Sequence, residues 1–248
     1  MARVTDPQWW PLALAALAVL AGAVSVRTTG MGFALLSSPF LVMALGPVEG
    51  ILVTNVCGIV AALLNLTVVR ADLDWGRAAK VVPAGLVGTV PGALLVLWLP
   101  APVLAIAISL LVLGGLLFTI GSRSLQVPNS YWVGAGGGFA SGVMTVTAGV
   151  GGPGLVIYAL ATQWEHRGFA ATAQLHFAVL GAAALVAKWS LPTLPVSGWA
   201  LLLVMMVVGL LGGNVLARWV HGPRAMRWVI VIAMAGALLS LTQGFVQL

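Results

Sequence analysis

Two glycine-rich turns hold most of the groups in this sequence that could bind a ligand. The first is Arg27-Thr28-Thr29-Gly30-Met31-Gly32, and the second is Thr147-Ala148-Gly149-Val150-Gly151-Gly152. Each turn separates two apolar stretches, so each is expected to break a helix and to leave backbone N–H groups without helical partners. Glycine lets a ligand approach the backbone closely, and threonine hydroxyls add further donors. The expected chemistry is anion binding by Thr28, Thr29, Gly30, Gly32, Thr145, Thr147, Gly149, Gly151 and Gly152. The alternative is that these glycines only allow membrane helices to pack closely.

Four further side chains extend this candidate site. Arg27 carries a guanidinium suited to oxyanions, unless the first turn lies at the cytoplasmic surface, where Arg27 would only help to set the topology. Asn55 and Gln174 stand 119 residues apart, the shift that also lays Thr29–Gly32 on Ala148–Gly151. We expect these two carboxamides to act as a pair of neutral hydrogen-bond donors to the anion. His176 is a candidate proton carrier or anion donor. Interhelical hydrogen bonding is the alternative for Asn55 and Gln174, and packing for His176.

The sequence lacks the residues that most enzymes and cation sites need. Its acids are Asp6, Glu49, Asp72, Asp74 and Glu165, and none lies in the middle of an apolar stretch. No metal site, no cofactor and no enzyme motif is predicted. Ser37 or Ser38 with His176 is the enzyme alternative, an intramembrane hydrolase, but the sequence offers no third group for it.

The composition predicts an integral membrane protein. Of 248 residues, 61% are hydrophobic and 6% are charged, with a mean hydropathy of +1.11. Soluble domains carry about 25% charged residues, which this chain lacks. The formal net charge of +6 does not indicate nucleic-acid binding, because the basic residues lie in short loops beside apolar spans.

Apolar stretches define the expected helices. Six of them approach the ~20 residues needed to cross a membrane, at 50–69, 81–99, 101–121, 169–187, 199–217 and 228–248. Four shorter stretches form two pairs, each divided by a glycine-rich turn, at 12–26 and 33–45 and at 131–146 and 153–163. We interpret each pair as a hairpin of short helices whose tip lies within or near the membrane.

Loop charge then predicts two inverted repeats. Loops 70–80, 122–130, 164–168 and 218–227 carry eight of the eleven basic residues, so they are placed on the cytoplasmic side. This placement requires five helical segments in each half, and an odd number inverts the second half. The expected fold is an all-α membrane protein with repeats at 1–124 and 125–248, in one membrane domain. Such repeats are common in secondary transporters, which bind substrate where broken helices meet.

Motifs in both halves resemble those of the sulfite exporter TauE/SafE family of membrane permeases. In the first half they run from Thr29-Gly30-Met31-Gly32-Phe33 through Ser38-Pro39-Phe40-Leu41 to Leu45-Gly46-Pro47. In the second half they run from Ser141-Gly142-Val143-Met144-Thr145 through Gly149-Val150-Gly151-Gly152-Pro153 to Tyr158. The first half has Gly30-Met31-Gly32-Phe33 where the commonest form of the family has a glycine triplet. Ser38, within the first motif, joins the candidate substrate-binding residues.

The resemblance implies a multi-pass transporter of the bacterial cytoplasmic membrane for sulfite, sulfonates or sulfoacetate, acting as an exporter. The expected partners are a small anion and the lipid bilayer, and homo-oligomerisation is left open. Two alternatives remain. A permease for another small anion would share these features, whereas a non-transporting assembly factor would have sealed helix interfaces and no central cavity.

Overall fold

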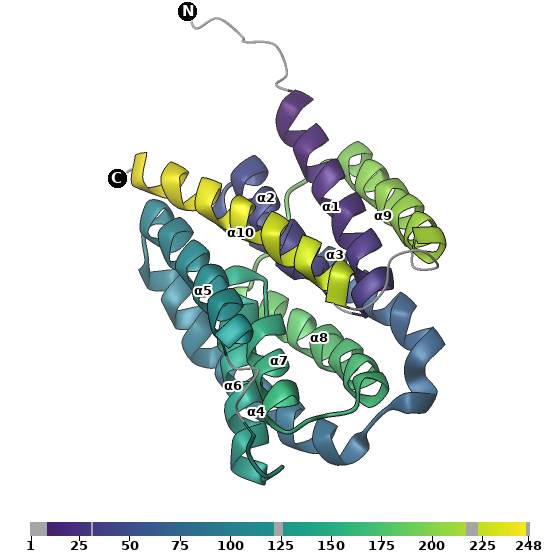
Figure 1. Cartoon of the computed structure of the whole chain (residues 1–248). Coiled ribbons are helices and arrows are strands. Elements are labelled where there is room, and N and C mark those ends of the chain that lie inside the picture. Colours follow the sequence, from purple (N-terminus) through teal and green to yellow (C-terminus); the bar gives the residue numbers. More distant parts are fainter. Residues whose placement is uncertain (1–8, 31, 122–125, 217–222, 247–248) are drawn as a thin grey trace, which may run out of the picture.

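The described part of the chain is built from helices alone. The computed structural model describes residues 9–30, 32–121, 126–216 and 223–246. Its elements, in chain order, are α1 (Trp9–Thr29), α2 (Phe33–Leu45), α3 (Pro47–Val69), η1 (Arg70–Asp72), α4 (Trp75–Trp98), α5 (Ala101–Gly121), α6 (Tyr131–Ala148), α7 (Gly152–Ala161), α8 (His166–Lys188), α9 (Val196–Leu216) and α10 (Pro223–Val246) (Figure 1). Within these residues, α1, α3, α4, α8 and α9 are long and apolar enough to cross a membrane.

The first helix is longer than the sequence indicated. The apolar stretch at 12–26 predicted a short helix, but α1 has 21 residues and continues to Thr29. Its polar end is compatible with a helix because the threonine hydroxyls bond to carbonyls one turn earlier. Thr28 Oγ1 donates to the Val24 carbonyl at 3.1 Å, and Thr29 Oγ1 donates to the Ser25 carbonyl at 2.8 Å.

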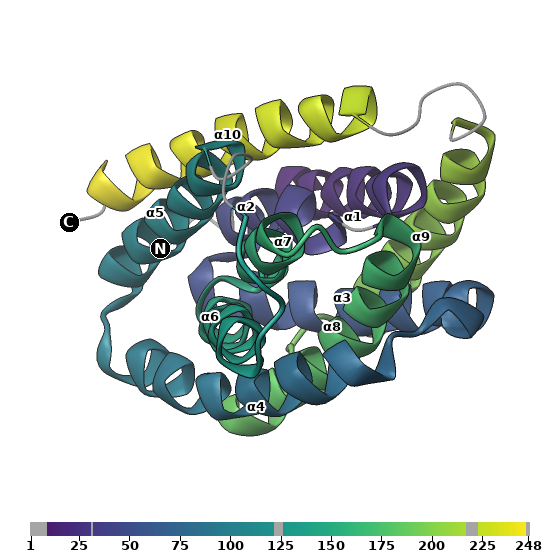
Figure 2. The same ribbon diagram turned by 60° about the horizontal axis from the view of Figure 1, so that its bottom comes forward.

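Helices from the two halves of the chain pack against one another. α4 lies along α6, α1 along α9, α3 along α8 and α5 along α10 (Figures 1 and 2). The shift that carries Gly30 onto Gly149 also carries α1–α5 onto α6–α10, in order. Under it the α1–α9 pair becomes the α6–α4 pair, and the α2–α10 pair becomes the α7–α5 pair. These contacts between the halves therefore occur in matched pairs.

Glycines allow two of these helix pairs to approach closely. A methyl group at Gly142 of α6 would overlap the Gly85 carbonyl of α4. On the other pair, a methyl group at Gly209 of α9 would lie 2.6 Å from the Leu20 carbonyl oxygen of α1. Small residues at such contacts are typical of membrane helices, which gain packing when their backbones approach.

The outer surface is apolar and carries tryptophans at helix ends. Trp9, Trp75 and Trp98 are 78%, 67% and 75% exposed, and they stand at the start of α1 and at the two ends of α4. Tryptophan favours the membrane–water interface because its ring is apolar and its N–H is polar. With the apolar helices, these features indicate a multi-pass membrane protein.

Candidate functional site

A cavity of about 180 Å³ lies where helices of both halves meet. α1, α2, α3 and α5 supply part of its wall, and α6, α7, α8 and α10 supply the rest. Seven of the predicted site residues line it: Gly32, Asn55, Thr145, Gly149, Gly151, Gly152 and Gln174. Apolar side chains complete the wall, among them Phe33, Leu116, Val156 and Phe177. Both glycine-rich turns thus contribute to one cavity.

The second glycine-rich turn connects α6 to α7. Gly149 has a φ of 69°, a left-handed conformation that glycine adopts without a steric penalty. Ser38 of α2 donates a hydrogen bond to the carbonyl of Ala148, the last residue of α6. A methyl group at Gly149 would lie 3.1 Å from Cγ2 of Thr54 in α3, and one at Gly151 would lie 2.6 Å from Oγ of Ser141. The turn is therefore packed closely against α2, α3 and α6.

The first glycine-rich turn connects α1 to α2 and lies against α8. Gly30 and Gly32 have φ values of 79° and 109°, again in the left-handed region. Gln174 Nε2 donates to the Gly30 carbonyl at 2.7 Å, across 144 residues of sequence. A methyl group at Gly30 would lie 3.2 Å from the Cβ of Ala170, one turn earlier in α8. Gln174 thus binds the protein backbone as well as lining the cavity.

Asn55 has a different environment from Gln174. It is only 3% exposed and lines the cavity from α3. Among the described residues, its Nδ2 has no hydrogen-bond partner. A buried amide N–H₂ without a partner costs about 1–3 kcal/mol. A ligand acceptor in the cavity would remove that cost.

The hydroxyl groups predicted for the site mostly bond within the protein. Thr145 Oγ1 donates to the Ser141 carbonyl at 2.7 Å, and Thr147 Oγ1 donates to the Val143 carbonyl at 2.8 Å. Of the predicted hydroxyl residues that the structure describes, Thr145 lines the cavity, whereas Thr28, Thr29, Ser38 and Thr147 lie outside its lining. These hydrogen bonds use the hydroxyl protons to satisfy carbonyls, so backbone N–H groups and carboxamides remain as the donors for an anion.

Arg27 lies on the side of α1 that packs against α9. A methyl group at Gly213 of α9 would lie 2.8 Å from the Cβ of Arg27. Its Nε is buried and has no hydrogen-bond partner among the described residues. Arg27 is not part of the cavity lining, although its neighbour Val26 is.

His176 is fully buried and pairs with a serine that the sequence analysis did not single out. Its Nε2 shares a hydrogen bond of 2.8 Å with Ser141 Oγ, and it lies outside the cavity lining. The serines of the hydrolase alternative bond elsewhere, Ser37 to the Phe33 carbonyl at 2.7 Å and Ser38 to Ala148. The pairing of either serine with His176, which the hydrolase alternative requires, is therefore not formed.

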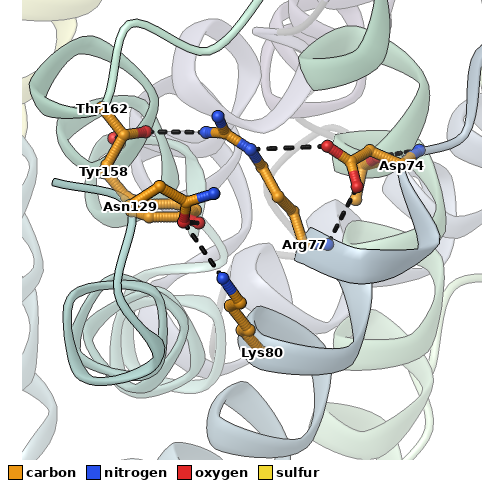
Figure 3. Close-up of polar contacts among 7 residues, drawn as sticks. Asp74, Arg77, Lys80, Asn129, Tyr158 and Thr162 are labelled. Carbon is orange, nitrogen blue, oxygen red and sulfur yellow. Dashed lines mark hydrogen bonds and ion pairs between the residues drawn. The ribbon is translucent and has the colours of Figure 1, made fainter.

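A polar cluster at the start of α4 was also missed (Figure 3). Arg77 donates from Nη1 to Thr162 Oγ1 at 2.7 Å, and its Nε lies 3.4 Å from Asp74 Oδ2. Its guanidinium carbon lies 4.7 Å from the centre of the Trp164 ring. The cluster joins α4 to the end of α7, the helix whose other end lines the cavity. Arg77 and Asp74 had appeared in the sequence only as loop charges, and nothing local identified Thr162 as their partner.

Lys80 and Tyr158 reach a common acceptor beside this cluster. Lys80 Nζ donates to Asn129 Oδ1 at 3.2 Å, and the Tyr158 hydroxyl donates to the same oxygen at 2.6 Å. α4 is thus connected to α7 by a second route (Figure 3). Together the two routes fix the end of α7 that lies away from the second turn.

Comparison with known proteins gives the family. The sequence profile of the sulfite exporter TauE/SafE family matches residues 14–241, which is most of the chain. No curated protein and no solved structure matches it. The match includes both glycine-rich turns and every helix that lines the cavity. The chain therefore belongs to the sulfite exporter TauE/SafE family.

Proposed function

We propose that this protein transports small sulfur-containing anions, such as sulfite, sulfonates or sulfoacetate, and binds them in the cavity between its two glycine-rich turns. The family is one of membrane transporters for sulfur anions such as sulfite. The observation that carries the proposal is Asn55, a residue of the cavity lining whose buried Nδ2 has no hydrogen-bond partner among the described residues. A sealed helix interface, as expected for an assembly factor without transport activity, would offer neither a cavity nor a free donor.

The donors at this site are neutral, which suits transport. The N–H group of Gly152, the first residue of α7, has no acceptor within its own helix, and the helix dipole places partial positive charge there. The next residue, Pro153, has no N–H group to donate. Asn55 adds a carboxamide N–H₂ to the same cavity. The described lining contains no Lys or Arg side chain. A site of this kind can hold an anion without binding it too tightly for release.

The helix pairing supports an inverted-repeat architecture. Repeats at 1–124 and 125–248, related by a pseudo-twofold axis, would account for the matched contacts α1–α9 and α6–α4, and α2–α10 and α7–α5. Each repeat then supplies one glycine-rich turn and one carboxamide to the cavity. In such transporters the substrate binds between the repeats, and movement of one repeat against the other changes access to it.

Location in the cytoplasmic membrane belongs to the same proposal. The loops at 70–80, 122–130, 164–168 and 218–227 would then face the cytoplasm, because they carry most of the basic residues. Cysteine labelling from each side of the membrane would test this. Loops 70–80 and 218–227 on opposite faces would contradict the inverted repeats.

Binding by the purified full-length protein tests the site. Calorimetric titration with sulfite, methanesulfonate, sulfoacetate and acetate should show binding of the sulfur anions. Acetate tests the alternative that the protein is a permease for carboxylates. Asn55→Leu should weaken binding by about ten- to a hundredfold, because a hydrogen bond to a charged ligand contributes about 1.5–3 kcal/mol.

Asn65→Leu is the matched control. Asn65 is a buried carboxamide on the same helix, outside the cavity lining. This variant should keep the affinity of the unaltered protein even if its melting temperature falls. Normal affinity in Asn55→Leu, or no binding of any of these anions by the unaltered protein, would contradict the proposed site.

A further inference from the structure

The two glycine-rich turns are equivalent in sequence but have different partners. The 119-residue shift pairs Gly30 with Gly149 and Asn55 with Gln174. In the first turn, Gln174 donates to the Gly30 carbonyl at 2.7 Å. In the second turn, Asn55 is near the corresponding glycine, because its neighbour Thr54 packs on Gly149 and both Asn55 and Gly149 line the cavity. Within the described ranges, Asn55 nevertheless makes no equivalent bond, and its Nδ2 has no partner.

The length of the carboxamide side chain accounts for the difference. Glutamine has one methylene more than asparagine, so Gln174 reaches a backbone carbonyl on a separate segment. The second turn does not need a carboxamide for this purpose, because Ser38 already donates to the carbonyl of Ala148 at the end of α6. A carbonyl at a helix end carries partial negative charge, and both turns have one such carbonyl occupied by a side-chain donor.

We propose that this asymmetry places the anion at the second turn, with Asn55 as its donor and Gln174 as a positioning residue that occupies the carbonyl of the first turn. This inference rests on the proposed function and specifies it further. Gln174 orders Gly30 by donating to its carbonyl. Asn55 is buried and lines the same cavity as Gly149 and Gly152, and its Nδ2 has no hydrogen-bond partner in the part of the chain that the structure describes.

Exchanging the two carboxamides tests the assignment. The measurements are methanesulfonate affinity by calorimetry and the melting temperature of the full-length protein in detergent, for Asn55→Gln, Gln174→Asn and the double variant. In Asn55→Gln the longer side chain extends into the cavity and reaches the carbonyl of the second turn. Affinity should then fall by about ten- to a hundredfold while the melting temperature is kept.

The other two variants separate positioning from direct binding. Gln174→Asn should weaken methanesulfonate binding less than Asn55→Gln does, because it removes a contact that orders the first turn and not a donor to the anion. It should also melt at a lower temperature, because the Gly30 carbonyl loses its donor. The double variant should bind methanesulfonate no better than Asn55→Gln, because a donor freed at position 174 lies beside the first turn and the anion lies at the second. Recovery of affinity in the double variant would show that position 174 can donate to the anion and would overturn the assignment.

Asn55→Ala provides a second measurement if the longer side chain prevents folding. It removes the donor without adding volume, and it should weaken binding as strongly as Asn55→Gln. Unchanged affinity in either Asn55 variant, or loss of affinity in Gln174→Asn with Asn55→Gln unaffected, would overturn the assignment of roles. Failure of the unaltered protein to bind methanesulfonate, sulfite or sulfoacetate would instead refute the proposed function.

Discussion

Replacement of Arg77 by leucine should destabilise the attachment of α4 to the end of α7. Arg77 donates a 2.7 Å hydrogen bond to Thr162, lies 3.4 Å from the Asp74 carboxylate and stacks 4.7 Å from the Trp164 ring centre. A hydrogen bond from a charged donor contributes about 1.5–3 kcal/mol. The stacking adds about 0.5–2 kcal/mol.

The expected total for Arg77→Leu is smaller than the simple sum. The Asp74 carboxylate is 37% exposed, so its ion pair contributes about 0.2–1 kcal/mol. One guanidinium makes all three contacts, and such contributions are not additive. We expect the free energy of unfolding to fall by about 2–4 kcal/mol, which corresponds to a melting temperature lower by roughly 5–15 °C for a chain of this size.

Melting of the purified variants in detergent provides the assay. Arg77→Lys should recover part of the loss, because lysine keeps the charge but not the planar guanidinium that bonds and stacks at once. Arg70→Leu is the control, since Arg70 is exposed in η1. If Arg77→Leu and Arg70→Leu melt at the same temperature as the unaltered protein, the cluster does not stabilise α7 and the reasoning is wrong.

Two further variants test the second turn and the buried histidine. Gly151→Ala places a methyl group 2.6 Å from Ser141 Oγ and against Thr145 Oγ1, so the cavity wall must shift. The affinity for methanesulfonate should therefore fall about tenfold or more. Gly136→Ala is the control, because its methyl group meets open space, and this variant should bind normally in the same titration. Ser141→Ala removes the hydrogen bond to Nε2 of His176. The Nδ1 atom of the same ring already lacks a partner among the described residues. Thermal melting should show that the free energy of unfolding falls by about 1–3 kcal/mol. An unchanged melting curve would mean that this buried pair contributes nothing to stability.

The sequence was sufficient to predict an integral membrane protein built from helices, because that prediction depends on composition and local pattern. Long stretches without charge must be buried in lipid as helices, since only internal hydrogen bonds satisfy their backbone there. The helical structure, its apolar surface and the match to the TauE/SafE family confirm this part of the prediction. The length predicted for α1 was too short. Hydropathy alone does not detect threonine hydroxyls that bond within the helix, so it did not indicate that α1 continues through Arg27-Thr28-Thr29.

The sequence also indicated which residues could surround a ligand. Seven predicted residues border the cavity, because glycines at breaks and carboxamides in apolar helices are recognisable without a structure. Their individual roles were not recognisable. Asn55 and Gln174 had been expected to act alike. Gln174 instead donates to Gly30, whereas Asn55 Nδ2 has no partner among the residues that the structure describes.

Only the tertiary structure decided which groups these side chains bond to, because each partner lies far away in the chain. Gln174 meets Gly30 across 144 residues, Ser38 meets Ala148 across 110, and Arg77 meets Thr162 across 85. A local pattern fixes where a helix starts and which residues are apolar, but a hydrogen bond between helices depends on how they pack and on the length of each side chain. For the same reason, Arg27 could be recognised from sequence as a charge in an apolar environment, whereas its position against α9 followed only from the packing of α1 on Gly213.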